Sequence, residues 1–267
     1  MNILDSFRLD DRVAIVTGGS RGIGFGIASA FASVGAQVVI AARDEAALES
    51  ARHDIAGAGG TVLAVTADVT SQTGAAEVAE VAAAAIERFG GIDVLVNNVG
   101  GARGPGFTTS SLRRMSTEDF DNCFRFNLRS TILMAQETIE PMRARGGGSV
   151  VNIGSAIGRP YLSQIRGSSL YASAKAGLIQ LTRYMALEWS PDVRVNCIAS
   201  GLVESPASDE RVQGELRANC LSHMASDRIG KPEDIAATAL LLASDAGQWI
   251  TGATYDVNGG MGLRSMI

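Results

Sequence analysis

Short apolar runs alternate with helical stretches along most of the chain. Residues 13–16 and 38–41 are two such runs, and each is followed by a stretch with helical character. Strands that are apolar nearly throughout, separated by helices, indicate a parallel sheet covered on both faces. Further runs lie at residues 62–65, 94–96, 150–153, 193–198 and 253–257. The sequence therefore predicts an α/β fold with a doubly wound parallel sheet and helices on both faces.

Helices are predicted between these runs. One ends near residue 34, and others cover residues 45–58 and 75–89. A long helix is expected after Ser116, a residue type that favours helix N-caps. The last helix opens around Pro232, where the missing proline N–H is harmless. Two long irregular loops are expected over residues 99–115 and 199–228, and long loops in a compact domain are often functional.

Length and charge limit the classes of function. The 267 residues suffice for one large domain with a buried core, and no linker or repeat divides residues 1–267. A net charge of −5 offers no electrostatic footprint for nucleic acid or an anionic membrane. No apolar run reaches spanning length, and the N-terminus lacks the apolar segment of a signal peptide. We therefore expect a cytoplasmic protein with no nucleic-acid or membrane partner.

The cysteines and histidines show no pattern of a metal site. Cys123, Cys197 and Cys220 are odd in number and scattered, as expected of free thiols in a reducing compartment. His53 and His223 have no ligand spacing around them. A zinc site and a Ser-His-Asp triad are therefore not expected.

A glycine-rich turn follows the first apolar run, in the sequence TGGSRGIG (residues 17–24). Its spacing is wider than G-x-G-x-x-G, but the physical reason is the same. Glycines let the turn tighten and let the backbone approach a pyrophosphate at the N-terminus of the next helix. The turn predicts a dinucleotide-binding loop, with the candidate contacts Gly18, Ser20, Arg21, Gly22, Ile23 and Gly24.

Tyr171 and Lys175 stand four residues apart in the sequence YASAK, which places them on one face of a helix. The ordinary pKa of a tyrosine is near 10, and a neighbouring ammonium favours the phenolate and lowers that pKa. The pair is therefore a candidate general acid or base with its tuning cation. On these five residues alone, a solvated pair on a helix surface is an equal alternative.

The motifs TGGSRGIG, NNVG (residues 97–100) and YASAK, in this order, resemble the short-chain dehydrogenase/reductase family, and the resemblance covers residues 12–260. The chain resembles the 3-oxoacyl-acyl-carrier-protein reductases of that family, and a hydroxysteroid or sugar-alcohol role stays open. The resemblance implies a Rossmann-type fold and hydride transfer between a nicotinamide cofactor and a carbonyl or secondary alcohol. No metal is implied.

The same resemblance implies roles for individual residues. Ser155 is expected to hold the substrate carbonyl, and Asn127 to anchor a water molecule in a proton relay. Tyr171 is expected to exchange the proton, and Lys175 to bond the nicotinamide ribose. Further cofactor contacts are expected from Asp68, Val69, Asn98, Gly100, Gly201, Val203 and Ser205.

Two stretches depart from the family pattern. Ser155 and Tyr171 are 16 positions apart, a longer separation than usual, with the extra residues within 158–169. Three other serines lie nearer to the tyrosine, namely Ser163, Ser168 and Ser169. Ser200 stands where the family has proline, which frees one backbone φ angle before the expected nicotinamide loop.

The cofactor prediction depends on the end of the second strand. An acidic residue there would bind the ribose hydroxyl of NAD. The position reads Ala42 followed by Arg43, and Arg21 lies in the glycine loop. Guanidinium groups match phosphate geometry, so NADP is favoured over NAD. Asp44 and Glu45 would favour NAD if the strand ended one or two residues later.

Three further expectations concern substrate, assembly and an alternative function. Arginines near the predicted mouth could attract an anionic substrate or be solvated surface: Arg103, Arg113, Arg114, Arg159 and Arg166. A homotetramer is expected from the apolar faces of the long helices, and residues 204–228 are expected to form a lid. The alternative from another class is a catalytically silent redox sensor that binds a dinucleotide.

Overall fold

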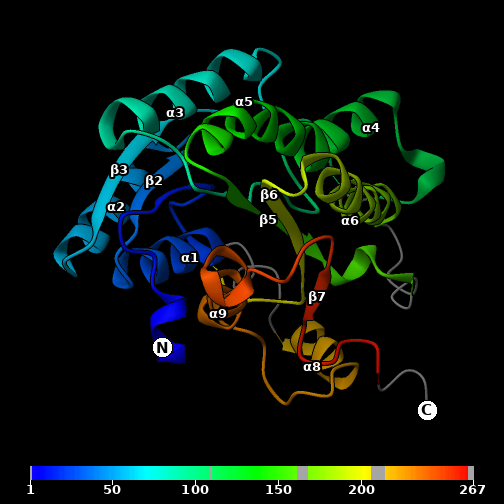
Figure 1. Ribbon diagram of the computed structural model, residues 1–267. Coiled ribbons are helices and arrows are strands. Elements are labelled where there is room, and N and C mark those ends of the chain that lie inside the picture. Colours follow the sequence, from blue (N-terminus) through cyan, green and yellow to red (C-terminus); the bar gives the residue numbers. More distant parts are fainter. Residues whose placement is uncertain (1, 109, 161–167, 206–213, 264–267) are drawn as a thin grey trace.

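A seven-stranded sheet with the strand order β3-β2-β1-β4-β5-β6-β7 forms the centre of the molecule (Figure 1). The computed structural model describes residues 2–108, 110–160, 168–205 and 214–263. All neighbouring strands are parallel, which confirms the predicted α/β class. The strands are β1 (Val13–Thr17), β2 (Gln37–Ala42), β3 (Thr61–Thr66), β4 (Val94–Asn97), β5 (Gly148–Ser155), β6 (Val193–Ser200) and β7 (Thr254–Val257).

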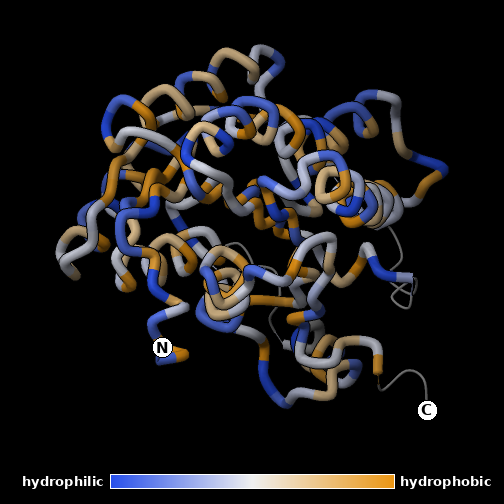
Figure 2. The backbone as a smooth tube through the Cα atoms, in the orientation of Figure 1, coloured by the Kyte–Doolittle hydropathy of each residue, from blue (hydrophilic) through white to orange (hydrophobic). Residues whose placement is uncertain are grey.

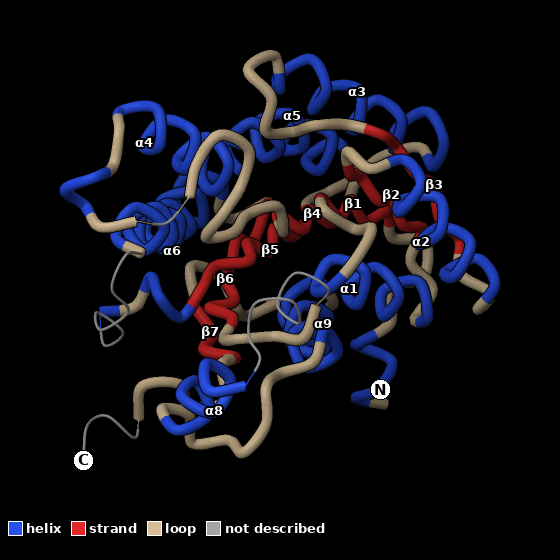
Figure 3. The backbone as a smooth tube through the Cα atoms, turned by 180° about the vertical axis from the view of Figure 1, so that it is seen from behind, coloured by secondary structure: helices blue, strands red, loops and turns tan. Residues whose placement is uncertain are grey.

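Helices cover both faces of this sheet (Figure 3). The helices are α1 (Gly22–Ser33), α2 (Glu45–Gly57), α3 (Gly74–Phe89), α4 (Thr117–Phe124), α5 (Ser130–Ala144), α6 (Ser169–Trp189), α8 (Gly214–Ser222) and α9 (Pro232–Ala243). One core cluster joins the sheet to α1, α2 and α9, and a second joins it to α3, α5 and α6. Apolar residues accordingly concentrate along the strands between the two helical layers (Figure 2).

The order of the strands reverses beside β1. The chain runs from β1 to β2 and β3 on one side, then returns to β4 on the other side. Such a switch point opens a crevice outside the carboxyl ends of the strands, where ligands bind in open α/β sheets. The glycine loop, which follows β1, lies at this crevice.

The single long helix expected after Ser116 is interrupted. Ser116 caps α4 as predicted, since its Oγ accepts from the Asp119 backbone N–H at 3.0 Å and the Asp119 carboxylate accepts from the Ser116 N–H at 2.9 Å. A π-helical turn, Arg125–Arg129, then separates α4 from α5. A π turn inserts an extra residue into the helix and so changes which side chains face inward. Asn127, at its centre, is fully buried.

The segment 199–228 is also more regular than predicted. Strand β6 continues to Ser200, whose Oγ donates to the Gly154 carbonyl at 3.2 Å, because parallel pairing with β5 extends to this residue. Residues 214–222 of the expected lid form helix α8. Residues 206–213, also part of that expected lid, lie outside the described residues.

A buried polar chain ties α6 to the sheet. The Asn97 Nδ2 on β4 donates to the Asn152 Oδ1 on β5 at 3.0 Å, and the Asn152 Nδ2 donates to the Thr182 Oγ1 on α6 at 3.0 Å. All three side chains are at most 3% exposed. Buried polar groups that are fully paired fix one arrangement of the elements that carry them. This chain therefore sets the position of α6 on the sheet.

Replacing Asn152 by alanine is expected to lower the free energy of unfolding by about 2–4 kcal/mol, because partners on two other elements lose their hydrogen bond. Urea denaturation measures the change. Asn219→Ala, on the exposed surface of α8, is the control and should shift the free energy by less than about 0.5 kcal/mol. Equal midpoints of urea denaturation for the two variants would contradict the structural role of the polar chain.

Candidate active site

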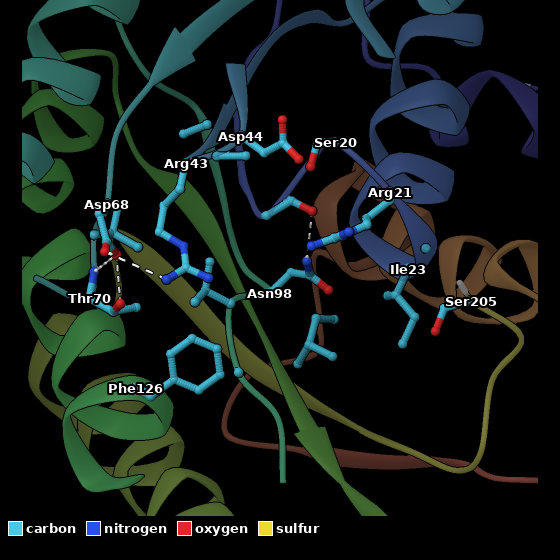
Figure 4. A pocket seen from close by; sticks show the side chains of 18 of the residues that line it. Ser20, Arg21, Ile23, Arg43, Asp44, Asp68, Thr70, Asn98, Phe126 and Ser205 are labelled. Carbon is cyan, nitrogen blue, oxygen red and sulfur yellow. Dashed lines mark hydrogen bonds and ion pairs between the residues drawn. The ribbon is translucent and has the colours of Figure 1, made fainter. Parts of the chain in front are cut away.

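A cavity of about 630 Å³ opens at the carboxyl ends of the strands, at the switch point beside β1 (Figure 4). Of the predicted cofactor contacts, only Gly24 and Gly201 do not line it. Those that line it are Gly18, Ser20, Arg21, Gly22, Ile23, Arg43, Asp68, Val69, Asn98, Gly100, Tyr171, Lys175, Val203 and Ser205. The structure therefore brings together residues from most of the motifs in one concave space.

The glycine loop forms a tight cradle at the start of α1. Gly18 and Gly22 have φ angles of +66° and +56°, which favour glycine. A side-chain carbon at position 24 would collide with the Gly18 carbonyl oxygen, so Gly24 permits close packing of the helix on the turn. The N-cap residue Arg21 makes no side-chain cap hydrogen bond. The first N–H groups of α1 are thus left without a side-chain cap beside the cavity, and helix N-termini of this kind suit a pyrophosphate.

Asn98 fixes this cradle to the neighbouring strand. Its Nδ2 donates to the carbonyl oxygens of Thr17 at 2.9 Å and Gly18 at 3.3 Å. In return, the Thr17 Oγ1 accepts from the Asn98 backbone N–H at 3.0 Å. The side-chain amide and the backbone N–H of Asn98 therefore both hold the turn between β1 and α1 in place.

Arg43, Asp68 and Thr70 form a polar cluster beside the cradle. Figure 4 shows the Arg43 side chain directed towards Asp68, and the Arg43 Nη1 lies 3.8 Å from the Asp68 Oδ2. The other oxygen, Oδ1, accepts from the Thr70 N–H at 3.0 Å and from the Thr70 hydroxyl at 2.6 Å. The Asp44 Oδ1 accepts from the Ala47 N–H at 3.1 Å and so caps α2.

Thr70 and Phe126 line the cavity and were missed by sequence reasoning. Thr70 could have been found, because a hydroxyl two positions after an aspartate often closes a local turn with it. Phe126 belongs to the π-helical turn, where its ring lies 5.8 Å from that of Phe107. No pattern of helical periodicity would place this ring in the cavity.

Lys175 lines the cavity beside β5, three places along the sheet from β2, the strand that Arg43 follows. It is 3% exposed, and its Nζ donates to the Ile153 carbonyl at 2.9 Å. The Tyr171 ring centroid is 6.0 Å from the same Nζ, and the nearby Ser155 hydroxyl partly opposes the rise that burial causes in the pKa of the Tyr171 phenol. Ser155 ends β5, and α6 carries the other two residues. Packing of α6 on the sheet thus brings the three together.

Asn127 lies behind this group, held by the loop that follows β4. Its Oδ1 accepts from the Gly101 N–H at 2.8 Å, while its Nδ2 donates to the carbonyl oxygens of Gly101 and Cys123, each at 3.0 Å. A methyl group at Gly100 would lie 2.7 Å from the Lys175 Nζ and 2.9 Å from the Asn127 Oδ1. The two polar atoms therefore face one small space that only glycine leaves open.

A family model described as enoyl-(acyl carrier protein) reductase matches residues 18–262, nearly the whole chain. The chain belongs to the short-chain dehydrogenase/reductase family. An uncharacterized oxidoreductase of Mycobacterium tuberculosis is 41% identical over 261 residues, which cover 97% of this chain and 95% of that relative. A 3-oxoacyl-[acyl-carrier-protein] reductase of Chlamydia muridarum is 38% identical, with 95% and 98% covered.

A solved structure of the family has a closely similar backbone. It is a 7α-hydroxysteroid dehydrogenase complexed with NADH and 7-oxo glycochenodeoxycholic acid, with a TM-score of 0.90, 33% identity and 98% of both chains covered. This likeness confirms the Rossmann-type fold and an oxidoreductase family whose members bind nicotinamide dinucleotides. The comparisons give no support to the alternative of a silent redox sensor.

The expectation that Lys175 lowers the pKa of Tyr171, drawn from their four-residue spacing, needs correction. Burial raises the pKa of Tyr171, and the Ser155 hydroxyl only partly opposes that rise. Burial also lowers the pKa of Lys175 to about 8. Because both groups lose water on folding, each favours its neutral form.

Among the serines that compete with Ser155, only Ser168 and Ser169 lie in described residues. The Ser169 hydroxyl lies 4.0 Å from the Met115 sulfur. Ser168 is the N-cap position of α6 and makes no side-chain cap hydrogen bond. Ser163 lies outside the described residues. The effect of its hydroxyl on the pKa of Tyr171 therefore favours Ser155.

The arginines expected at the mouth of the cavity differ in their pairing and exposure. Arg159 pairs with Asp256, with 2.9 Å between Nη2 and Oδ2. Arg103, Arg113 and Arg114 are exposed, and Arg166 lies outside the described residues.

Gly201 contacts the loop after β7, where a side-chain carbon would lie 2.6 Å from the Asn258 Cα. Gly201 therefore permits close packing against that loop, and it does not line the cavity.

Within the described residues, no group of three or more potential ligands could hold a metal ion. In the same part of the chain, no helix has the length and apolar character needed to cross a membrane. Cys123, Cys197 and Cys220 are all free thiols.

Proposed function

We propose that this protein is an NADP(H)-dependent oxidoreductase that interconverts a carbonyl compound and a secondary alcohol. One observation carries the proposal: Tyr171 and the buried Lys175 line the same cavity as the glycine cradle and Arg43. The tyrosine and lysine come from α6 beside β5, and the cradle and Arg43 follow β1 and β2. A dinucleotide would extend between them with its nicotinamide beside the tyrosine.

The proposed roles follow from the chemistry of these side chains. When bound, the nicotinamide supplies or accepts the hydride. The Tyr171 hydroxyl donates its proton to the carbonyl oxygen during reduction, and the Ser155 hydroxyl orients that oxygen. A water molecule held between the Lys175 Nζ and the Asn127 Oδ1 would return a proton towards Tyr171. The small space at Gly100 supports this position for the water.

NADP is proposed over NAD for two reasons. Arg43 follows the last residue of β2, is half-exposed and lines the cavity, so its guanidinium can reach a ribose phosphate. Asp44, the rival that would bind the ribose hydroxyl of NAD, already accepts the hydrogen bond that caps α2. NADH in the related 7α-hydroxysteroid dehydrogenase makes NAD the alternative that experiment separates.

Replacing Arg43 by alanine is expected to weaken NADPH binding about tenfold or more and to leave NADH binding within about twofold. The reason is that only NADPH carries the phosphate that the guanidinium would bind. Fluorescence titration of the nicotinamide measures both dissociation constants. Arg52→Ala is the matched control, since Arg52 is a similarly exposed arginine that pairs with Glu49 on α2. Equal losses for the two cofactors would rule out phosphate recognition by Arg43.

The substrate class and the assembly belong to the same proposal. Relatives named for 3-oxoacyl-carrier-protein and hydroxysteroid chemistry make these the first two substrate classes to test. We propose a cytoplasmic homotetramer, because the outer faces of α4 and α6 expose apolar side chains. Phe120, Tyr184 and Leu187 are 45%, 55% and 74% exposed.

A further inference from the structure

The segment 202–205 crosses the mouth of the central cavity and contacts the glycine loop. Val203 and Ser205 both line the cavity. A side-chain carbon at Gly22 would lie 3.3 Å from the Ser205 Cβ, and Figure 4 shows Ser205 close to Ile23 of the same loop. We call residues 202–205 the strap. Its position determines the width of the cavity beside the N-terminus of α1.

Val203 anchors the strap to the core. It is 7% exposed and belongs to the cluster that joins the sheet to α1, α2 and α9. A second cavity, of about 300 Å³, is lined by Leu202 and Val203. The backbone of the strap on either side of Val203 is held by hydrogen bonds.

Gly230 supplies two of these interactions. The Gly230 N–H donates to the Leu202 carbonyl at 3.0 Å, and the Glu204 N–H donates to the Gly230 carbonyl at 2.8 Å. Val203 and Gly230 form a parallel bridge. Gly230, which lies just before α9, therefore helps to fix the position of the strap.

An ion pair encloses Gly230. The Arg228 Nη1 lies 2.7 Å from the Asp234 Oδ2, and the Arg228 Nη2 lies 2.9 Å from the Asp234 Oδ1. The Asp234 Oδ2 also accepts from the Lys231 N–H at 2.7 Å, and the Arg228 Nη1 donates to the Ile229 carbonyl at 3.1 Å. The two side chains thus close a ring over the backbone that carries Gly230.

Helix α9 connects this ring to the glycine loop. A side-chain carbon at Gly26 on α1 would lie 2.6 Å from the Pro232 Cβ, so α1 packs directly on the first turn of α9. The Arg228 guanidinium lowers the pKa of Asp234 to about 2, so the pair stays charged through the neutral range. Below the ordinary carboxyl range this stabilisation is lost, because the acid must be protonated.

We infer that Arg228 and Asp234 are positioning residues for dinucleotide binding: their bidentate ion pair fixes Gly230, and through it the strap, against the glycine loop. Neither residue touches the reacting atoms. The inference rests on the proposed function, since it requires a dinucleotide in the central cavity. It predicts that loss of the pair weakens cofactor binding and leaves the chemical step intact.

Arg228→Gln, Asp234→Asn and the double variant test this inference. Asparagine keeps an oxygen that can accept from the Lys231 N–H, so the cap of α9 survives. Each single variant is expected to raise the dissociation constant of NADPH about three- to tenfold, because the pair is bidentate but half-exposed. The double variant should be no worse than the singles. Glu233→Gln, an exposed carboxylate on the same helix turn, is the control and should change nothing.

Three measurements separate positioning from general stability. The KM for NADPH should rise while kcat stays within about twofold, and the variants should remain fully folded at the assay temperature even though loss of the ion pair lowers their melting temperature. Arg228→Lys, which keeps one charged hydrogen bond, should recover part of the affinity. Unchanged NADPH affinity in Arg228→Gln, or an equal loss in Glu233→Gln, would overturn the positioning role alone. A wild type that binds neither NADPH nor NADH would overturn the proposed function as well.

Discussion

Replacement of Tyr171 by phenylalanine is expected to reduce turnover by a factor of about 10²–10⁴, the range ascribed to general acid–base catalysis. The change removes one hydroxyl and almost no volume. The half-buried ring can keep its packing on α6, so folding and NADPH affinity should be preserved. The loss should fall on kcat, because the hydroxyl acts on the carbonyl oxygen only during the reaction.

Tyr184→Phe is the matched control for this variant. Tyr184 lies on the same helix and is 55% exposed on the outer surface. Its replacement should leave turnover within about twofold, since Tyr184 does not line the cavity. A Tyr171→Phe enzyme that runs within a few-fold of this control would show that the proton donor is another group.

Replacement of Lys175 by methionine is expected to reduce both dinucleotide affinity and turnover, each by about tenfold or more. The ammonium is proposed to bond the nicotinamide ribose and to hold the relay water, and methionine can do neither. Its similar length fills the same buried space beside Ile153. Affinity is measured by fluorescence titration and turnover by the absorbance of NADPH.

The same variant should be at least as stable as the wild type without cofactor. Burial lowers the pKa of Lys175 from 10.5 to about 8, so the folded wild type bears the cost of a buried charge below pH 8. Between these two values the unfolded chain binds the extra proton, and wild-type stability rises with pH. Lys175→Met lacks this rise, so its advantage should shrink from pH 8 to 10.5. A variant that is less stable at pH 7 would contradict this.

Much of the fold was predictable because it depends on local chemistry. Continuous apolar runs indicated a sheet covered on both faces, and the structure confirms this. The Ser116 cap and Pro232 at the start of α9 were also correct, since both act within one helical turn. The glycine loop and the YASAK helix lie where their motifs predicted, on either side of one cavity.

Features that depend on distant contacts were not predictable. The π turn around Asn127 is an extra residue in a helix whose sequence reads as continuous, and it brings Phe126 to the cavity. The raised pKa of Tyr171 depends on burial, which no four-residue spacing reveals. The positioning role inferred for Arg228 and Asp234 depends on Gly230, which lies between them in sequence. Gly230 hydrogen-bonds with the strap (residues 202–205), a segment that is not its neighbour in sequence.

Direct transfer of hydride is the central claim, and NADPH with deuterium at its transferable position tests it most directly. The labelled cofactor is mixed with the protein and a panel of 3-oxoacyl thioesters, oxosteroids and simple ketones. Mass spectrometry of the alcohol products should show deuterium on the carbinol carbon with the wild type, and the amount of labelled alcohol should fall by about 10²–10⁴ with Tyr171→Phe. Tight binding of NADPH without label in any product would contradict the proposed oxidoreductase and favour a silent dinucleotide-binding sensor.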